Sequence, residues 1–459
     1  MVIVGAGPAG LAAAIEARRL GVDVLVIDEY ARAGGQFYKQ PAYPLTDQQR
    51  HTLPPQVKEG MQLAARAASM GVKFWFESQV WGLFPGLRLG VVRGSISTEV
   101  VAQRLIIACG AHERCIAFPG WTLPGVITPG AAQTLIKAHS VLPGRRTIVA
   151  GSGPFLLAVA AQLLKTGAEV VTYVEAAPWS WATLSRFTTH PSRWGELARY
   201  VWPLLRARIA PRLRTAVIAA HGKTALSAVT LASLDSHGRP MPETKRQIEV
   251  DTLAVGYGFR PSCELTTLAG CAHQFSETAG GRYCVVDRDT GETNVEGVYA
   301  AGEVTGIGGA RAAFQEGRIA GLSVASSLKH WDDEASQRLH DTRLRRRREQ
   351  KFADLVSCTF APPLGLAEFI TDNTVICRCE EVSGRAVREA VTAGAHTATA
   401  IKMWTRCGMG RCQGRMCGWS IGRYVAALTG SNVESIGISQ PRIPIKPVKL
   451  QHVLATNPD

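Results

Sequence analysis

Several features are scarce in this 459-residue sequence, and each scarcity narrows the class of protein. Only 19% of the residues are charged and 46% are hydrophobic, which excludes a disordered chain and a coiled coil. No apolar run reaches the ~18–20 residues that a membrane-spanning helix needs. No secretory leader precedes the first predicted strand, so we expect a cytoplasmic protein.

Acidic residues are outnumbered: 51 Lys and Arg face 37 Asp and Glu, a formal net charge of +14. The one dense basic run, Arg343–Arg348, is interpreted as a solvated linker or helix face, because no nucleic-acid fold signature accompanies it. We therefore expect no nucleic-acid partner. Peripheral docking of the positive chain to an anionic inner-membrane surface stays open.

The first 28 residues read as strand, glycine turn, helix and strand. Gly5, Gly7 and Gly10 form G-x-G-x-x-G, and Asp28 ends the second strand. In such a unit the glycines permit a tight turn, close approach of a pyrophosphate and helix–strand packing, while the acid accepts the ribose hydroxyls. The helix N-terminus supplies free N–H groups to the phosphates. The further binding candidates near this turn are Pro8, Ala9, Glu29, Gly35 and Gln36.

A second copy of this pattern begins about 146 residues later. Gly151 and Gly153 open its turn, but Leu156 stands at the third glycine position, and Glu175 ends the following strand. A side chain there pushes the helix away from the strand, and Glu175 argues against the 2′-phosphate of NADPH. A working NAD site, a repurposed site for another nucleotide such as ATP, and a structural unit without a ligand all remain open.

A third turn, G-V-Y-A-A-G-E at 297–303, follows another predicted strand. Together with the two glycine motifs it resembles the two-dinucleotide-binding-domain flavoproteins, over residues 1 to about 330. The resemblance implies FAD at the first motif, with Gly302, Glu303, Gly309 and Ala310 on its ribityl and pyrimidine side. Disulfide reductases of that fold carry a paired cysteine motif beside the flavin, and neither 36–40 nor 131–138 contains one.

Cysteine is concentrated near the C-terminus, where five of the 11 cysteines lie within 41 residues. Four thiolates suit either Zn²⁺ or a [2Fe–2S] cluster, and a C-x-C first half is unusual for structural zinc. The glycine-rich G-M-G-R-C-Q-G turn offers N–H groups to cluster sulfides. The predicted ligands are Cys377, Cys379, Cys412 and Cys417, with Cys407 as the spare. The segment resembles the bacterioferritin-associated-ferredoxin-like (BFD-like) [2Fe–2S] domain.

The order of these parts resembles the A or α subunits of heteromeric opine oxidases, hydrogen cyanide synthase and dye-linked proline dehydrogenases. The sequence stretches on which this resemblance rests include F-P-G-W-T-L-P-G-V, A-G-E-V-T-G-I-G-G-A and T-R-C-G-M-G-R-C-Q-G-R-M-C-G. The resemblance implies an electron-transfer subunit that serves a catalytic flavoprotein of the amine-oxidase type. Electrons from the C–N bond of an amino acid or opine would reach a quinone or other acceptor, and an FMN at the interface is left open.

Two alternative functions stay open. One is a self-contained NAD(P)H-dependent FAD/[2Fe–2S] reductase, and the other is a zinc-bearing adaptor with a vestigial flavoprotein fold. The expected fold is α/β, with two Rossmann-like modules and a small α-rich C-terminal domain. The predicted divisions are an FAD-binding domain at 1–115 and 265–330, a second nucleotide-binding-type domain at 116–264, a linker at 331–375, a BFD-like domain at 376–435 and a Pro-rich tail at 436–459. Residues 116–129 and 440–448 are candidate partner contacts or internal packing.

Overall fold

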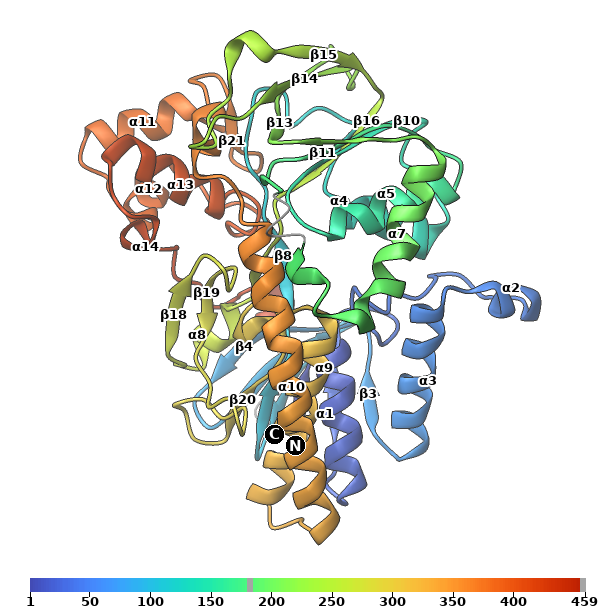
Figure 1. Ribbon diagram of the computed structural model, residues 1–459. Helices are drawn as coiled ribbons and strands as arrows, with labels where there is room; N and C mark the ends of the chain where they lie inside the picture. Colours follow the sequence, from blue (N-terminus) through green and yellow to red (C-terminus); the bar gives the residue numbers. More distant parts are fainter. Residues whose placement is uncertain (180–184, 455–459) are drawn as a thin grey trace. The chain divides into compact units, whose positions relative to one another are not determined.

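Residues 1–179 and 185–454 are described by a computed structural model, shown in Figure 1. The chain folds into two compact units. Unit 1 comprises Met1–His112, Arg260–Asp354 and the chain from Gln440 onward. Unit 2 comprises Glu113–Phe259 and Leu355–Ser439. Strands β8 (Ala111–Glu113) and β17 (Phe259–Pro261) contain two of the points at which the chain passes between the units.

Unit 1 is built on a five-stranded parallel sheet with the order β20-β7-β1-β2-β3. Its strands are β20 (Val298–Ala300), β7 (Leu105–Ile107), β1 (Val2–Val4), β2 (Leu25–Ile27) and β3 (Lys73–Trp75). Most of their residues are apolar and buried, as expected for a parallel sheet covered on both faces. The crossover between β1 and β2 is helix α1 (Pro8–Arg19), with proline in its first turn, where no backbone N–H is needed.

Helix α1 packs closely against α9 (Gly309–Ser327) because small residues line both helices. A Cβ on Gly317 would lie 2.0 Å from the carbonyl oxygen of Ala9, and one on Gly321 would lie 2.4 Å from that of Ala13. Only glycine fits at these two positions of α9. The glycine turn at the start of α1 is therefore held beside the turn that precedes α9.

The rest of unit 1 consists of two antiparallel sheets and several helices. One sheet contains β4 (Ser78–Phe84), β5 (Arg88–Arg93) and β6 (Ile96–Val101). The other contains β18 (His273–Ser276) and β19 (Gly281–Cys284). The remaining helices are α2 (Asp47–Thr52), α3 (Pro55–Ser69), α8 (Glu264–Leu268), η3 (Glu303–Thr305), α15 (Leu450–Leu454) and most of α10 (Asp333–Thr359).

Unit 2 repeats the design, with a five-stranded parallel sheet in the order β12-β11-β10-β16-β9. Its strands are β12 (Pro211–Leu213), β11 (Glu169–Glu175), β10 (Arg146–Gly151), β16 (Thr252–Gly256) and β9 (Val126–Ile127). Figure 1 shows α4 (Pro129–His139), α5 (Phe155–Lys165) and α7 (Trp194–Arg206) on one side of this sheet. An antiparallel sheet adds β13 (Thr215–His221), β14 (Ala228–Ser233) and β15 (Arg246–Glu249), and the 3₁₀ turns are η1 (Pro191–Arg193) and η2 (Pro242–Thr244).

The C-terminal cysteine-rich module also belongs to unit 2. It contains η4 (Leu364–Phe369), β21 (Val375–Cys377), β22 (Val382–Ser383), α11 (Gly384–Thr392), α12 (Ala398–Thr405), α13 (Gly418–Thr429) and α14 (Val433–Ile436). One hydrophobic core joins it to the nucleotide-type module: Phe118 and Tyr257 belong to the same buried cluster as Ile401 and Val425. The cysteine-rich module therefore shares a hydrophobic core with the nucleotide-type module of unit 2 and is not joined to it by a flexible linker alone.

The predicted α/β fold with two Rossmann-like modules and a helical C-terminal part is confirmed. The segment predicted as a linker, 331–375, holds the 27-residue helix α10 and the turn η4. The division of the chain into five domains stays a prediction. Among the residues described, no helix combines the length and the apolar character that spanning a bilayer would require.

Candidate functional site: two nucleotide loops and a thiol cluster

The first glycine loop, between β1 and α1, has the geometry of a phosphate-binding turn. Gly5 has φ +106°, and a Cβ on it would lie 2.4 Å from the carbonyl oxygen of Ala108. A Cβ on Gly10 would lie 1.8 Å from the carbonyl oxygen of Gly5. Gly35 comes so close to Gly7 that its Cβ would stand 2.9 Å from the Gly7 Cα. The loop therefore keeps bare backbone at the N-terminus of α1, where an anion is stabilised.

Asp28 lies at the carboxyl end of β2, beside this loop. Its carboxylate accepts the backbone N–H of Ala6 at 2.6 Å and that of Tyr30 at 2.8 Å. Burial raises the pKa of Asp28, and the two backbone N–H groups act in the opposite direction. Of the other predicted residues, Glu29 forms an ion pair with Lys446, and the exposed Gln36 donates to the Tyr30 hydroxyl at 2.8 Å.

The turn after β20 brings the late acidic residue into the same unit. Gly302 has φ +83°, and a Cβ on it would lie 3.0 Å from the Cβ of Ala9 in the first helix. Glu303 follows, and burial raises the pKa of its carboxyl to about 7, opposed by the backbone N–H of Gly309. Gly309 and Ala310 begin helix α9. The first glycine loop and the predicted Gly302–Ala310 segment thus lie together.

Glu316, on α9, holds this turn and was not predicted. Its carboxylate accepts the Gly302 N–H and the Thr305 hydroxyl, each at 2.9 Å. The Arg288 guanidinium donates to Glu316 at 3.3 Å and to the Thr305 carbonyl at 3.0 Å. Nothing in the local sequence marks Glu316, because its partners lie 11 to 28 residues away.

The second glycine loop, between β10 and α5, differs from the first. A Cβ on Gly151 would lie 1.7 Å from the Gly256 carbonyl oxygen, so the tight turn is retained. The helix, however, begins at Phe155, one position later than the corresponding Pro8 of α1. Leu156 is buried where the first loop has Gly10. The displacement of the helix from the strand that leucine predicts at this position stays a prediction.

Glu175, the acid of the second module, is fully buried and turned toward its own loop. It accepts the N–H of Gly153 at 3.2 Å, that of Ala177 at 2.9 Å and the Tyr173 hydroxyl at 3.3 Å. Burial raises its pKa to about 7. The loop is also met by the chain after α10: the Ser152 hydroxyl donates to the Phe360 carbonyl at 2.8 Å, and the Phe360 ring packs edge-on to Trp179.

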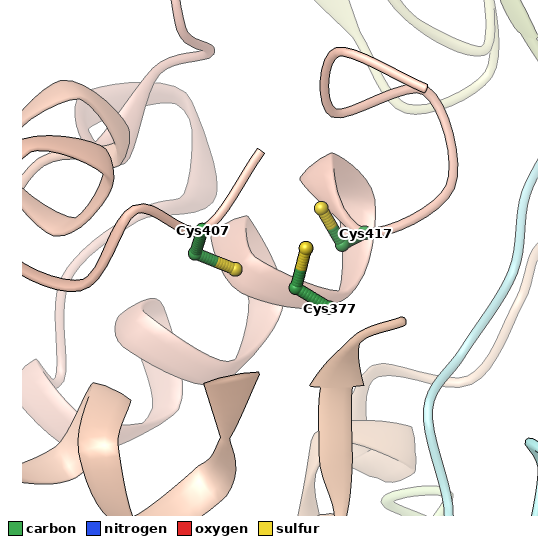
Figure 2. Close-up of side chains that lie close together, drawn as sticks. All are labelled: Cys377, Cys407 and Cys417. Atoms are coloured by element: carbon green, nitrogen blue, oxygen red, sulfur yellow. The ribbon is translucent and has the colours of Figure 1, made fainter. Parts of the chain in front are cut away.

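Three buried thiols meet in the C-terminal module, as Figure 2 shows. The Sγ atoms of Cys377, Cys407 and Cys417 lie within 4.8 Å of one another. They come from the end of β21, the loop after α12 and the residue before α13. Hydrogen bonds from the neighbouring thiols lower the pKa of Cys377 far below its ordinary value and raise that of Cys417.

The other two cysteines continue this cluster toward the surface. Cys412 hydrogen-bonds the Cys417 thiol, which lowers the Cys412 pKa to about 5, and it also contacts the thiol of Cys379. Backbone N–H groups point at the sulfurs: those of Gly408 and Glu380 at Cys377, and those of Met416 and Gly414 at Cys412. Soft thiols surrounded by N–H donors fit a thiolate-ligated metal centre.

Sequence spacing places all five cysteines together, but it ranks them differently from the structure. Of the predicted ligands, Cys377 and Cys417 are in the three-sulfur group, whereas Cys379 is exposed and Cys412 is half-buried. Cys407, predicted as the spare, completes that group. A Cβ on Gly410 would lie 2.2 Å from the Cys379 Cβ, so the glycine-rich turn lies directly against the first cysteine pair.

The two segments proposed as partner contacts are packed within their own units. Phe118 is fully buried in unit 2, where the Ala117 N–H donates to Ser420 Oγ at 3.1 Å and the Trp121 indole donates to the Val375 carbonyl. In unit 1, the Ile445 N–H donates to the Trp81 carbonyl at 2.8 Å. Internal packing therefore accounts for the buried core of 116–129. In 440–448 only Ile445 is buried and Ile443 is 39% exposed, so a partner contact there stays a prediction.

Comparisons with known proteins agree with this architecture. The family model "Pyridine nucleotide-disulphide oxidoreductase" matches residues 1–317, and "Sarcosine oxidase A3 domain" matches residues 371–457. The A subunit of opine oxidase from Agrobacterium tumefaciens (strain Ach5) is 30% identical, over 98% of this chain and 90% of the relative. The HcnB subunit of hydrogen cyanide synthase from Pseudomonas aeruginosa is 35% identical, over 97% of this chain and 96% of the relative.

The fold is also found among solved structures. L-proline dehydrogenase from P. horikoshii matches with a TM-score of 0.69 and 22% identity, over 98% of this chain and 78% of that chain. Thioredoxin reductase from T. acidophilum matches with a TM-score of 0.53 and 22% identity, over 72% of this chain and 98% of that chain. The family model implies FAD, and the bare loop at Gly7 and the carboxylate of Asp28 fit it. The chain belongs to the pyridine nucleotide-disulphide oxidoreductase family of flavin-dependent enzymes, together with HcnB and the A subunits of opine oxidases.

Proposed function

We propose that this chain is the electron-transfer subunit of a heteromeric oxidoreductase that dehydrogenates the C–N bond of an amino acid or an opine. The observation that carries the proposal is the combination of a flavin-binding fold and a five-thiol cluster on one chain, matched over nearly its whole length by proteins named as subunits. Bound FAD would accept an electron pair from an organic donor and release the electrons one at a time, and a [2Fe–2S] cluster would carry them singly to an electron-transport chain.

In unit 1, the residues that would hold FAD are those of the two adjacent turns. Gly5, Gly7 and Gly10, with Pro8, Ala9 and Gly35, would leave room for the pyrophosphate, while Asp28 and Glu29 would lie on the ribose side. Gly302, Glu303, Gly309 and Ala310 would face the ribityl and pyrimidine parts. Glu316 and Arg288 fix the Gly302 turn through the hydrogen bonds described above, so we assign them a positioning role.

For the cluster we propose a [2Fe–2S] centre rather than zinc. The N–H groups of Gly408, Gly414 and Met416 that reach the sulfurs are typical of iron–sulfur sites, where hydrogen bonds offset the negative charge. Cys377, Cys379, Cys412 and Cys417 remain the proposed ligands. Cys407 is placed to replace one of the two outer cysteines, because its Sγ already lies in the buried three-sulfur group.

The second glycine loop favours the electron-transfer role over a self-contained NAD(P)H reductase. Glu175 accepts two backbone N–H groups, as Asp28 does, but it is fully buried and also accepts the Tyr173 hydroxyl. The Ser152 hydroxyl of the loop is in turn bonded to the Phe360 carbonyl. A nicotinamide dinucleotide in the ordinary pose needs that carboxylate for its ribose and that loop for its pyrophosphate. The reductase remains the second candidate, since Gly151 and Gly153 keep the tight turn. The proposed electron-transfer role does not require a second nucleotide such as ATP, or an FMN held together with a partner chain. Either one would be an additional ligand beside FAD and the cluster.

The proposed partner is a catalytic flavoprotein of the amine-oxidase type, and the proposed acceptor is a quinone or a similar carrier. The names of the relatives support this substrate class, because they are subunits of an opine oxidase and of hydrogen cyanide synthase. The chain would work in the cytoplasm, at most peripherally attached to the inner membrane.

The test is anaerobic mixing of the purified, yellow chain with NADH or NADPH, followed near 450 nm. The proposal predicts no rapid bleaching with either nucleotide, and bleaching only when the catalytic partner and its amino acid or opine are added. Rapid bleaching by NADH alone would establish the reductase instead. A colourless chain with stoichiometric zinc would establish the adaptor.

A further inference from the structure

Helix α7 of unit 2 exposes more large apolar side chains than its place in a folded unit explains. Trp194 is 53% exposed, Leu197 47%, Trp202 62% and Leu205 60%. The same helix is already anchored elsewhere, because Leu204 is buried in the core that contains α5, and Tyr200 packs against that core. Contiguous exposed apolar patches are uncommon on soluble proteins and mark interaction sites.

The exposed residues share one side of the helix. At 100° per residue, Trp194, Val201 and Leu205 fall within about 40° of one another, and Leu197, Ala198 and Trp202 extend the stripe on both sides. Leu204 and Tyr200 lie beyond the Leu197 edge of the stripe, where they pack toward α5. Within the described part of unit 2, these side chains are left exposed.

The charged residues of α7 and of the chain on either side of it are almost all arginines. Between Ser185 and Arg214 the sequence has seven arginines, no lysine and one acid, Glu196, so 7 − 1 gives +6 of the chain's +14. Glu196 is paired with Arg193 at 3.4 Å. The arginines of this stretch that are exposed and make no ion pair within the described part of the chain are Arg186, Arg199, Arg206, Arg208, Arg212 and Arg214.

We propose that α7 docks this chain on an anionic lipid surface, lying in the interface with Trp194 and Trp202 among the headgroups. A helix with tryptophan and leucine on one face and arginine along its border has the composition of an interfacial helix. Arginines near the surface attract anionic headgroups. A neutral apolar partner would leave the positive charge of these arginines unpaired. A contact with a second copy of α7 would bring arginines against arginines, because the helix has almost no acids.

The experiment uses the full chain and vesicles of phosphatidylcholine with or without 30% phosphatidylglycerol, as a nominal composition. The expected result is co-flotation with the anionic vesicles, weakened by salt because surface charges are screened. Replacing both Arg199 and Arg206 with Gln should weaken partitioning about 30-fold. Trp202→Glu with Leu205→Glu should abolish it, while flavin content and the thermal midpoint stay unchanged.

A matched control replaces two exposed apolar residues elsewhere, Ile96 (68% exposed) and Val101 (67%) on β6, with Glu. This control should float like the wild type. Quenching by brominated phosphatidylglycerol should disappear in a Trp194→Phe, Trp202→Phe variant that still floats. Equal binding of the α7 and β6 variants overturns the proposal. An absence of vesicle binding also overturns it. In that case, release of a partner protein by the α7 substitutions would assign the stripe to a protein interface, and a changed oligomeric state in light scattering would assign it to a contact between copies.

Discussion

Glu175 provides a test of the second glycine loop, through the substitution Glu175→Gln. The carboxyl is fully buried, and burial raises its pKa from 4.5 to about 7. Such a group is protonated in the folded chain and ionised in the unfolded chain at intermediate pH, so its contribution to stability is present below pH 4.5 and is lost as pH rises through 7. The interval from 4.5 to about 7 corresponds to about 3 kcal/mol.

The expected result is therefore opposite to that of an ordinary buried hydrogen-bond deletion. Near pH 4.5 the Gln variant should resemble the wild type, because both side chains are neutral and offer one carbonyl to the Gly153 or Ala177 N–H. At about pH 8.5 the variant should be more stable by about 3 kcal/mol. The assay is denaturant unfolding of the purified chain at both pH values, with the free energies of unfolding compared between variants.

Glu169→Gln is the matched control, since Glu169 begins the same strand and is 60% exposed with Arg146 at 3.9 Å. Its loss should cost at most about 1 kcal/mol at either pH. A Glu175 variant that is less stable than the wild type at the higher pH would refute the reasoning. It would mean that the fold stabilises the ionised carboxylate, as an acid that binds a ribose requires.

The other predictions concern the first loop, the helix pair and the cluster. Gly10→Ala should abolish FAD retention, because the added Cβ would lie 1.8 Å from the Gly5 carbonyl oxygen. The measurement is flavin absorbance after gel filtration. The control is Gly195→Ala, which should retain FAD because nothing lies within 4 Å of its Cβ. Gly317→Ala should destabilise unit 1 by roughly 1–3 kcal/mol in denaturant unfolding, because its Cβ would lie 2.0 Å from the Ala9 carbonyl oxygen; an unchanged midpoint would contradict this packing. Cys377→Ser and Cys417→Ser should each remove the EPR signal of the reduced cluster, whereas the exposed Cys358→Ser should leave it intact.

The local parts of the site could be predicted from the sequence. Gly5, Gly10 and Asp28 lie within one strand–helix–strand unit, so their spacing alone defines the turn and its acid. The same holds for Leu156, which its spacing places at the third glycine position of the second turn. Short-range sterics decide these features, and they act between residues that are close in the chain.

The remaining contacts depend on parts of the chain that meet only in the fold. Glu316 reaches Gly302 across 14 residues, and Phe360 reaches Ser152 across 208. Spacing likewise shows that five cysteines gather, but not that Cys407 lies with Cys377 and Cys417, because the left-handed Arg406 turns the loop after α12 inward. The periodicity of apolar residues along the sequence does not predict such long-range contacts.

The most direct test of the central claim is the cofactor content of the full chain purified without oxygen. The account predicts one FAD, two irons and two acid-labile sulfides per chain, together with an EPR signal after reduction by one electron. One zinc per chain without labile sulfide, or a chain that never retains flavin, would contradict it.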